Sequence, residues 1–112
     1  TLLGMRIDIR SKRPILRNNV GGMSGPAVFP IAVRMVWQVS NAVSIPVIGM
    51  GGVDSGAAAM EMMLAGASAV QVGAAIFTDP YAPVRIVEEL QALLEEQHIA
   101  DVKEIIGAVK PW

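Results

Sequence analysis

Two short apolar runs, each interrupted or ended by glycine, stand out in the hydrophobic pattern of this chain. They cover residues 45–53 (IPVIGMGGV) and residues 69–76 (AVQVGAAI). Residues 54–65 lie between them and are rich in alanine, methionine and leucine, which are good helix formers. Asp54 or Ser55 can cap this helix, and Gly66 can supply a left-handed exit. The order predicted is therefore strand, glycine loop, helix, strand, glycine loop.

The predicted strands are residues 45–48 and residues 70–72. Continuous apolar runs of this length are typical of strands buried on both faces of a parallel sheet. Before the first strand, a helix is expected to begin at Pro30, because proline's missing N–H needs no partner in a first turn. Its apolar stripe recurs at four-residue steps and ends near Val43; the stripe consists of Ile31, Met35, Val39 and Val43.

The two ends of the chain predict further elements. Residues 1–8 resemble the tail of a strand entering a loop, residues 6–17 alternate weakly like a surface hairpin, and residues 18–26 form a glycine-rich loop. Near the other end, Asp79-Pro80 is expected to open a long helix that runs to about Gln97. The Asp101–Glu104 spacing of a capping box predicts a last short helix, closed by Gly107.

A βα unit thus recurs two to three times, which implies parallel strands with right-handed crossovers. The predicted fold class is α/β: the C-terminal part of an eight-stranded (β/α) TIM barrel, about its last three βα units. Residues 1–112 are expected to be a fragment of one such barrel domain.

Composition supports a piece of a larger protein over a membrane protein. The chain is 53% hydrophobic and 17% charged, with a mean hydropathy of +0.49. No run approaches the roughly 18 apolar residues of a spanning helix, and the start of the chain lacks the apolar core of a secretion signal. The absence of cysteine excludes disulfides and a thiolate nucleophile within this chain.

Charge and titratable residues add little chemistry. A net charge of −1 gives no attraction to nucleic acid, and the basic segment near the start lacks aromatic residues for base stacking. That segment is interpreted as a solvated loop or hairpin rather than an anion or partner site; its members are Arg6, Arg10, Lys12, Arg13 and Arg17. His98 is expected at the surface, and no metal site is predicted.

The glycine loops carry the candidate chemistry. In (β/α) barrels the loops after late strands bind phosphate through backbone N–H groups, and small residues allow the close approach. Gly51-Gly52 and Gly73-Ala74 each follow a predicted strand, and the helix that follows can add a positive dipole end. Such glycines can also serve only tight turns, but two loops on consecutive strands favour an anion site. A third loop, with Gly25 at its end, is expected over the same rim.

The pattern does not identify the ligand, since neither a Walker A motif nor a GxGxxG fingerprint occurs. From the loops alone, two interpretations stay open at this point. One is another phosphate-binding barrel, such as an isomerase or synthase acting on a sugar phosphate. The other is a non-catalytic half-barrel binding module.

Three segments carry a family resemblance: residues 21–27 (GGMSGPA), 46–53 (PVIGMGGV) and 70–75 (VQVGAA). They resemble the dihydroorotate dehydrogenases of pyrimidine synthesis, in particular the catalytic subunit of the NAD-linked class. The opening TLLGM also resembles the segment that follows an asparagine in that family. The likeness runs in order over nearly all of this chain and corresponds to the last part of the family's barrel.

The resemblance implies a cytoplasmic, FMN-dependent oxidation of dihydroorotate to orotate in de novo pyrimidine (UMP) synthesis. It implies that Gly25 approaches the flavin and that Thr1 touches the substrate. The phosphate would be held by Gly51, Gly52, Gly73 and Ala74. Ala74 departs from relatives that carry threonine there, so a side-chain hydroxyl contact is lost.

The resemblance also implies what lies outside this chain. The family's base, a cysteine in this class, and its flavin-contacting lysine have no counterpart here, so no catalytic residue is assigned and the chain alone is expected to be inactive. The implied partner is an electron-transfer subunit with FAD and an iron–sulfur cluster. The implied assembly is a homodimer of catalytic subunits within a heterotetramer.

Overall fold

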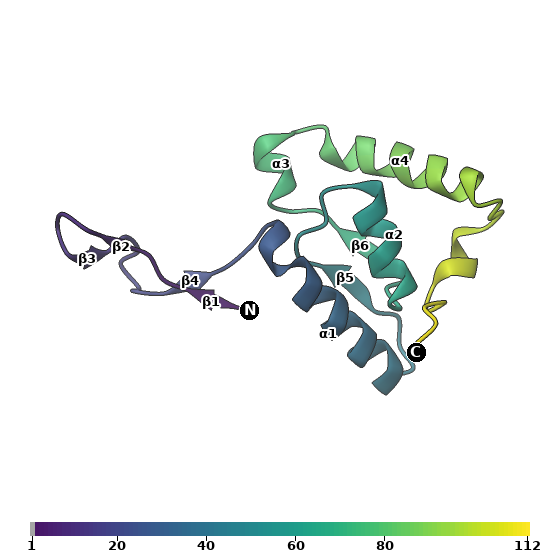
Figure 1. The fold of residues 1–112 in the computed structure, drawn as a ribbon, viewed down its shortest axis with the longest axis horizontal. Coiled ribbons are helices and arrows are strands. Elements are labelled where there is room, and N and C mark those ends of the chain that lie inside the picture. Colours follow the sequence, from purple (N-terminus) through teal and green to yellow (C-terminus); the bar gives the residue numbers. More distant parts are fainter. Residues whose placement is uncertain (1) are drawn as a thin grey trace.

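The computed structural model describes residues 2–112, which form an extended arm and an α/β body (Figure 1). The arm, residues 2–23, reaches away from the body, and the molecule measures 56 × 33 × 25 Å. Within residues 2–112, no helix combines the length and the hydrophobicity that crossing a membrane would take.

The arm is a pair of two-stranded antiparallel ladders. β1 (Leu3–Gly4) pairs with β4 (Gly21–Gly22), and β2 (Ile7–Asp8) pairs with β3 (Arg13–Pro14). The Asp8 carboxylate closes the outer turn by accepting bonds from two backbone N–H groups, at 2.8 and 2.9 Å. The hairpin predicted over residues 6–17 is therefore confirmed.

The expected strand tail within residues 1–8 corresponds to β1 in the described part of the chain. β1 belongs to the arm and not to the parallel sheet of the body. The cause is the return of the chain beside it, where the Met23 N–H donates to the Leu2 carbonyl at 2.8 Å. The described residues therefore hold two βα units preceded by a helix, at the lower end of the two to three units that the pattern predicts.

The body contains the predicted parallel strand pair. β5 (Ile48–Met50) and β6 (Ala69–Gln71) run in register, with Gly49 opposite Val70. β5 lies further along the chain than the predicted residues 45–48, because Pro46 has no N–H to donate and pairing starts where the Ser68 N–H reaches the Val47 carbonyl. Since the strands are parallel, the loops that follow them emerge at one edge of the sheet.

Helices cover one face of this sheet (Figure 1). α1 (Phe29–Ala42) packs on β5, and α2 (Gly56–Leu64) packs on β6 and on α4 (Ala82–Glu96). The Ser55 hydroxyl caps α2 by accepting the Ala58 N–H at 3.1 Å, as predicted. The other sheet face is open: Ile48 and Met50 are 52% and 55% exposed.

The end of the chain corrects one expectation and confirms another. The predicted helix over residues 79–97 begins later, at Ala82, and is preceded by a separate short helix, α3 (Ala75–Thr78). Asp79 has an extended backbone and ends α3, so Pro83 rather than Pro80 occupies the first turn of α4. The predicted capping box at Asp101 is present, and it opens the 3₁₀ helix η2 (Val102–Ile105).

The core lies between α2, α4 and the sheet. Met62 is fully buried and packs with Val53, Ala67 and Ile86. Met60 and Met63 join Ile105 in a neighbouring cluster of buried residues. This packing fixes α2 and α4 against the strands whose ends carry the glycine loops.

Candidate phosphate site

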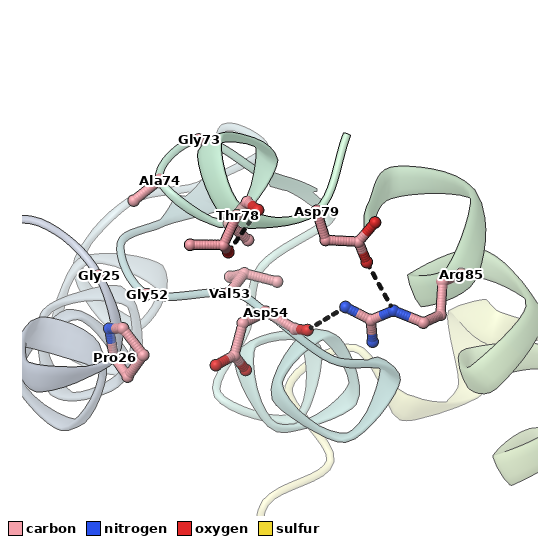
Figure 2. Close-up of a pocket in the computed structure, with 11 residues that line it drawn as sticks. Gly25, Pro26, Gly52, Val53, Asp54, Gly73, Ala74, Thr78, Asp79 and Arg85 are labelled. Atoms are coloured by element: carbon pink, nitrogen blue, oxygen red, sulfur yellow. Dashed lines mark hydrogen bonds and ion pairs between the residues drawn. The ribbon is translucent and has the colours of Figure 1, made fainter. Parts of the chain in front are cut away.

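Three loops meet at the carboxyl ends of β5 and β6. A cavity of about 480 Å³ lies between them, and a second of about 540 Å³ shares four of its lining residues. The sequence-predicted cofactor residues all line one or both cavities: Gly25, Gly51, Gly52, Gly73 and Ala74. The structure therefore brings together all five, from segments far apart in the sequence; Figure 2 shows Gly25, Gly52, Gly73 and Ala74. Thr1, the predicted substrate contact, lies outside the described residues.

The backbone conformation at positions 51 and 52 requires glycine. Their φ angles are +112° and +76°, a region that side chains disfavour. A Cβ on Gly52 would lie 2.7 Å from the Gly25 carbonyl oxygen and 2.8 Å from the Phe29 Cβ. Because Gly52 has no side chain, the loop after β5 can pack against the segment around Gly25. That segment continues into α1 by way of the short η1 helix (Pro26–Val28).

Gly73 has no such internal reason to be glycine. Its φ lies outside the left-handed region, and a Cβ added there would meet no protein atom within 4 Å. Gly73 faces the cavity. A side chain at this position would therefore obstruct a ligand that approaches the backbone. Gly25 also faces open space, but its φ of +89° is sufficient reason for glycine.

The turn after β6 offers backbone donors to this space. The Ile76 and Phe77 N–H groups close it by donating to the Gly73 and Ala74 carbonyls, at 3.0 and 3.2 Å. The N–H groups of a first helical turn have no intrahelical acceptor, so those of Ala74 and Ala75 can face a ligand in the cavity they line. An anion accepting several N–H bonds is the ligand that suits such a turn.

The N-terminus of α2 does not serve the cavity in the expected way. Its first N–H, on Gly56, donates to the Glu89 carboxylate of α4 at 2.6 Å. The anion at this helix end is therefore one of the protein's own side chains. The expected dipole contribution of the helix after Gly51-Gly52 is in this way directed at Glu89.

An arginine in the cavity wall was missed by sequence reasoning. Arg85 Nε donates to Asp79 Oδ2 at 3.0 Å, Nη1 to Glu89 Oε1 at 2.7 Å, and Nη2 to the Asp54 carbonyl at 3.2 Å. Figure 2 shows this guanidinium between the loops that carry Asp54 and Asp79. The i,i+4 spacing of Arg85 and Glu89 on α4 was the available signal, although it did not indicate a link to the cavity.

This network shifts the pKa values of Glu89 and Arg85. The pKa of Glu89 is held below its ordinary value, first by the Gly56 N–H bond and then by Arg85. The pKa of Arg85 is raised, first by its bond to Glu89 and then by Asp79. Both groups therefore stay charged, and the link between α2, α4 and the cavity is kept at neutral pH.

A parallel strand pair, with glycine loops at its carboxyl ends and helices behind it, is the arrangement found in (β/α) barrels, where loops at this edge often bind phosphate. The comparisons agree with this class. The family model described as dihydroorotate dehydrogenase matches residues 1–94, and the chain belongs to the dihydroorotate dehydrogenase family.

Curated relatives named "Dihydroorotate dehydrogenase B (NAD(+)), catalytic subunit" are similar along most of the chain. The protein from Geobacter metallireducens is 61% identical over 98% of this chain, and that from Halalkalibacterium halodurans is 54% identical over 96%. The chain spans only 36% and 35% of these relatives. A solved dihydroorotate dehydrogenase from Eimeria tenella, crystallised with ferulenol, superimposes with a TM-score of 0.76 at 27% identity, over 94% of this chain and 29% of that one. The predicted barrel fragment and family are thus confirmed.

Proposed function

We propose that residues 1–112 form part of a single FMN-binding barrel domain of a dihydroorotate dehydrogenase that oxidises dihydroorotate to orotate in pyrimidine (UMP) synthesis. The observation that carries the proposal is Gly73, which faces the cavity between three converging loops without a packing reason to be glycine. Family membership supports the choice of ligand, because a flavin mononucleotide carries the phosphate that such loops grip.

The residues present fit this cofactor. The backbones of Gly51-Gly52 and Gly73-Ala74 would hold the phosphate, and Gly25 would lie beside the flavin, where the cavity wall is bare. When bound, FMN supplies a hydride acceptor; the protein contributes binding, orientation and electrostatics. Because Ala74 has no hydroxyl, its contribution to the phosphate is limited to the backbone N–H.

The remaining machinery is proposed to lie in other parts of the enzyme. This chain has no cysteine to serve as base, so we expect it to be inactive alone. We propose Thr1 as a substrate contact. The relatives' printed names, an NAD(+) enzyme and a catalytic subunit, support a partner electron-transfer subunit. We further propose that this partner carries FAD and an iron–sulfur cluster, and that the assembly is a cytoplasmic heterotetramer built on a homodimer of catalytic subunits.

A hybrid subunit tests the proposal. This chain would replace the 110 matched residues of the Geobacter metallireducens catalytic subunit, and the hybrid would be purified with its flavin spectrum recorded. We expect bound FMN whose absorbance is bleached by dihydroorotate without oxygen. A folded hybrid that lacks flavin, or binds FMN and is not reduced by dihydroorotate, would overturn the proposed function.

A further inference from the structure

Arg85 connects two segments of the cavity wall through a single side chain. It lies on α4, yet its guanidinium bonds the Asp54 carbonyl in the loop after β5 and the carboxylate of Asp79 at the end of α3 (Figure 2). Its third bond, to Glu89, continues to the Gly56 N–H at the start of α2. The guanidinium therefore links the loop after β5 to the end of α3, the short helix that follows the Gly73-Ala74 turn.

The charges around the cavity indicate a second role for Arg85. Two carboxylates, Asp54 and Asp79, line the same cavity as Arg85, which is its one cationic side chain among the described residues. A phosphate placed there would be repelled by any carboxylate free to turn toward it. Asp79 is restrained on both oxygens, by Arg85 at 3.0 Å and by the Tyr81 N–H at 3.0 Å.

The donors of Arg85 indicate how it acts. Nε, Nη1 and Nη2 each already donate to a protein oxygen, and the planar fork is held by two carboxylates. A side chain fixed in this way orients its neighbours more readily than it reaches out to a ligand.

We propose that Arg85 is a positioning residue of the phosphate site. It sets the spacing between the loop after β5 and α3, which follows the Gly73-Ala74 turn, it neutralises Asp79, and it makes no bond to the cofactor. This inference rests on the proposed function. It goes further in assigning the phosphate affinity partly to a residue that the glycine pattern does not include.

Affinities for FMN and for riboflavin, which lacks the phosphate, separate this role from general structural support. They would be measured by flavin fluorescence quenching in the hybrid subunit described above, after removal of bound flavin. We expect Arg85→Met to weaken FMN binding about tenfold, because the Asp79 carboxylate that it releases repels the phosphate and the spacing around the site is lost, and to change riboflavin binding less than about twofold. Arg34→Met is the matched control, because the exposed Arg34 pairs with Gln38 on α1 and is not among the residues that line the cavities.

A double variant tests the neutralising role. Adding Asp79→Asn to Arg85→Met removes the released carboxylate, so we expect most of the FMN affinity to return. Equal weakening of FMN and riboflavin, no effect of Arg85→Met, or no rescue by Asp79→Asn would each overturn the inference; the last would indicate direct contact with the phosphate. If Arg85→Met does not fold, Asp79→Asn alone decides, since we expect unchanged or tighter FMN binding and a tenfold loss would contradict the role.

The starting hybrid separates this inference from the proposed function. If the hybrid with Arg85 intact binds FMN no better than riboflavin, the proposed phosphate site is wrong. If it prefers FMN and that preference survives Arg85→Met, only the role of Arg85 is wrong.

Discussion

Gly56 is the position where one added carbon should disturb the body most clearly. It is the first residue of α2 and is buried against α4. A Cβ placed on it would lie 2.4 Å from the Glu89 Cβ, 2.5 Å from the Leu90 amide nitrogen and 2.7 Å from the Glu89 carbonyl carbon. Two of these atoms are backbone, so Gly56→Ala can be accommodated only if α2 and α4 move apart.

Two opposing contributions decide how Gly56→Ala changes the free energy of unfolding. Replacing glycine by alanine inside a helix stabilises by up to about 1 kcal/mol, and less at a first helical residue. Overpacking costs about 1–3 kcal/mol. We therefore expect a net destabilisation of about 1–2 kcal/mol, which lowers the unfolding midpoint of a domain this size by about 5–15 °C.

Thermal unfolding followed by far-ultraviolet circular dichroism measures this shift. Gly73→Ala is the matched control, because its Cβ meets no atom within 4 Å and its backbone is not left-handed; we expect its stability to stay within about 0.5 kcal/mol. An unfolding midpoint for Gly56→Ala equal to that of the natural chain, or an equal fall for both variants, would refute the close packing of α2 on α4.

Three further predictions follow from the site and the core. Gly73→Val should weaken FMN binding by the hybrid at least tenfold at an unchanged unfolding midpoint, and a titration showing equal affinities would contradict the ligand approach at this residue. The lowered pKa of Glu89 gives stability that is present above its ordinary value near 4.5 and lost as the pH falls through the lowered pKa. Urea midpoints on either side of that pH should therefore differ less in Glu89→Gln than in the natural chain, and an equal difference would contradict the Glu89 bonds. Met62→Ala should cost about 2–5 kcal/mol, because the side chain is fully buried. Exposed Glu61→Ala should change the urea midpoint little, and equal losses in the two variants would contradict the placement of the core.

The elements that sequence reasoning found are those specified locally. The helix from Pro30 has a stripe that repeats every four residues, and α2 has a cap in Ser55 and an exit in Gly66. Strand positions shifted by one to three residues, because pairing, rather than the apolar run itself, decides where a ladder begins. The separate α3 was missed because Ala75 and Ile76 continue the apolar run of the predicted strand, and isoleucine, phenylalanine and threonine are weaker helix formers than alanine or leucine.

The candidate site also has a part that local sequence signals predict and a part that depends on packing. Five backbone positions could be predicted, because glycine after a strand is a local signal and parallel strands bring their ends together. The Arg85 network could not, because its bonds to Asp54 and from Gly56 to Glu89 join residues 31 and 33 positions apart. Such links depend on how α4 packs on α2, which no local pattern specifies.

A crystal structure of the hybrid subunit with FMN tests the central claim most directly. The phosphate oxygens should lie about 2.9 Å from backbone N–H nitrogens of both glycine loops, Gly51-Gly52 and Gly73-Ala74. A phosphate bound elsewhere in the barrel, or held only by side chains from outside these loops, would contradict the account.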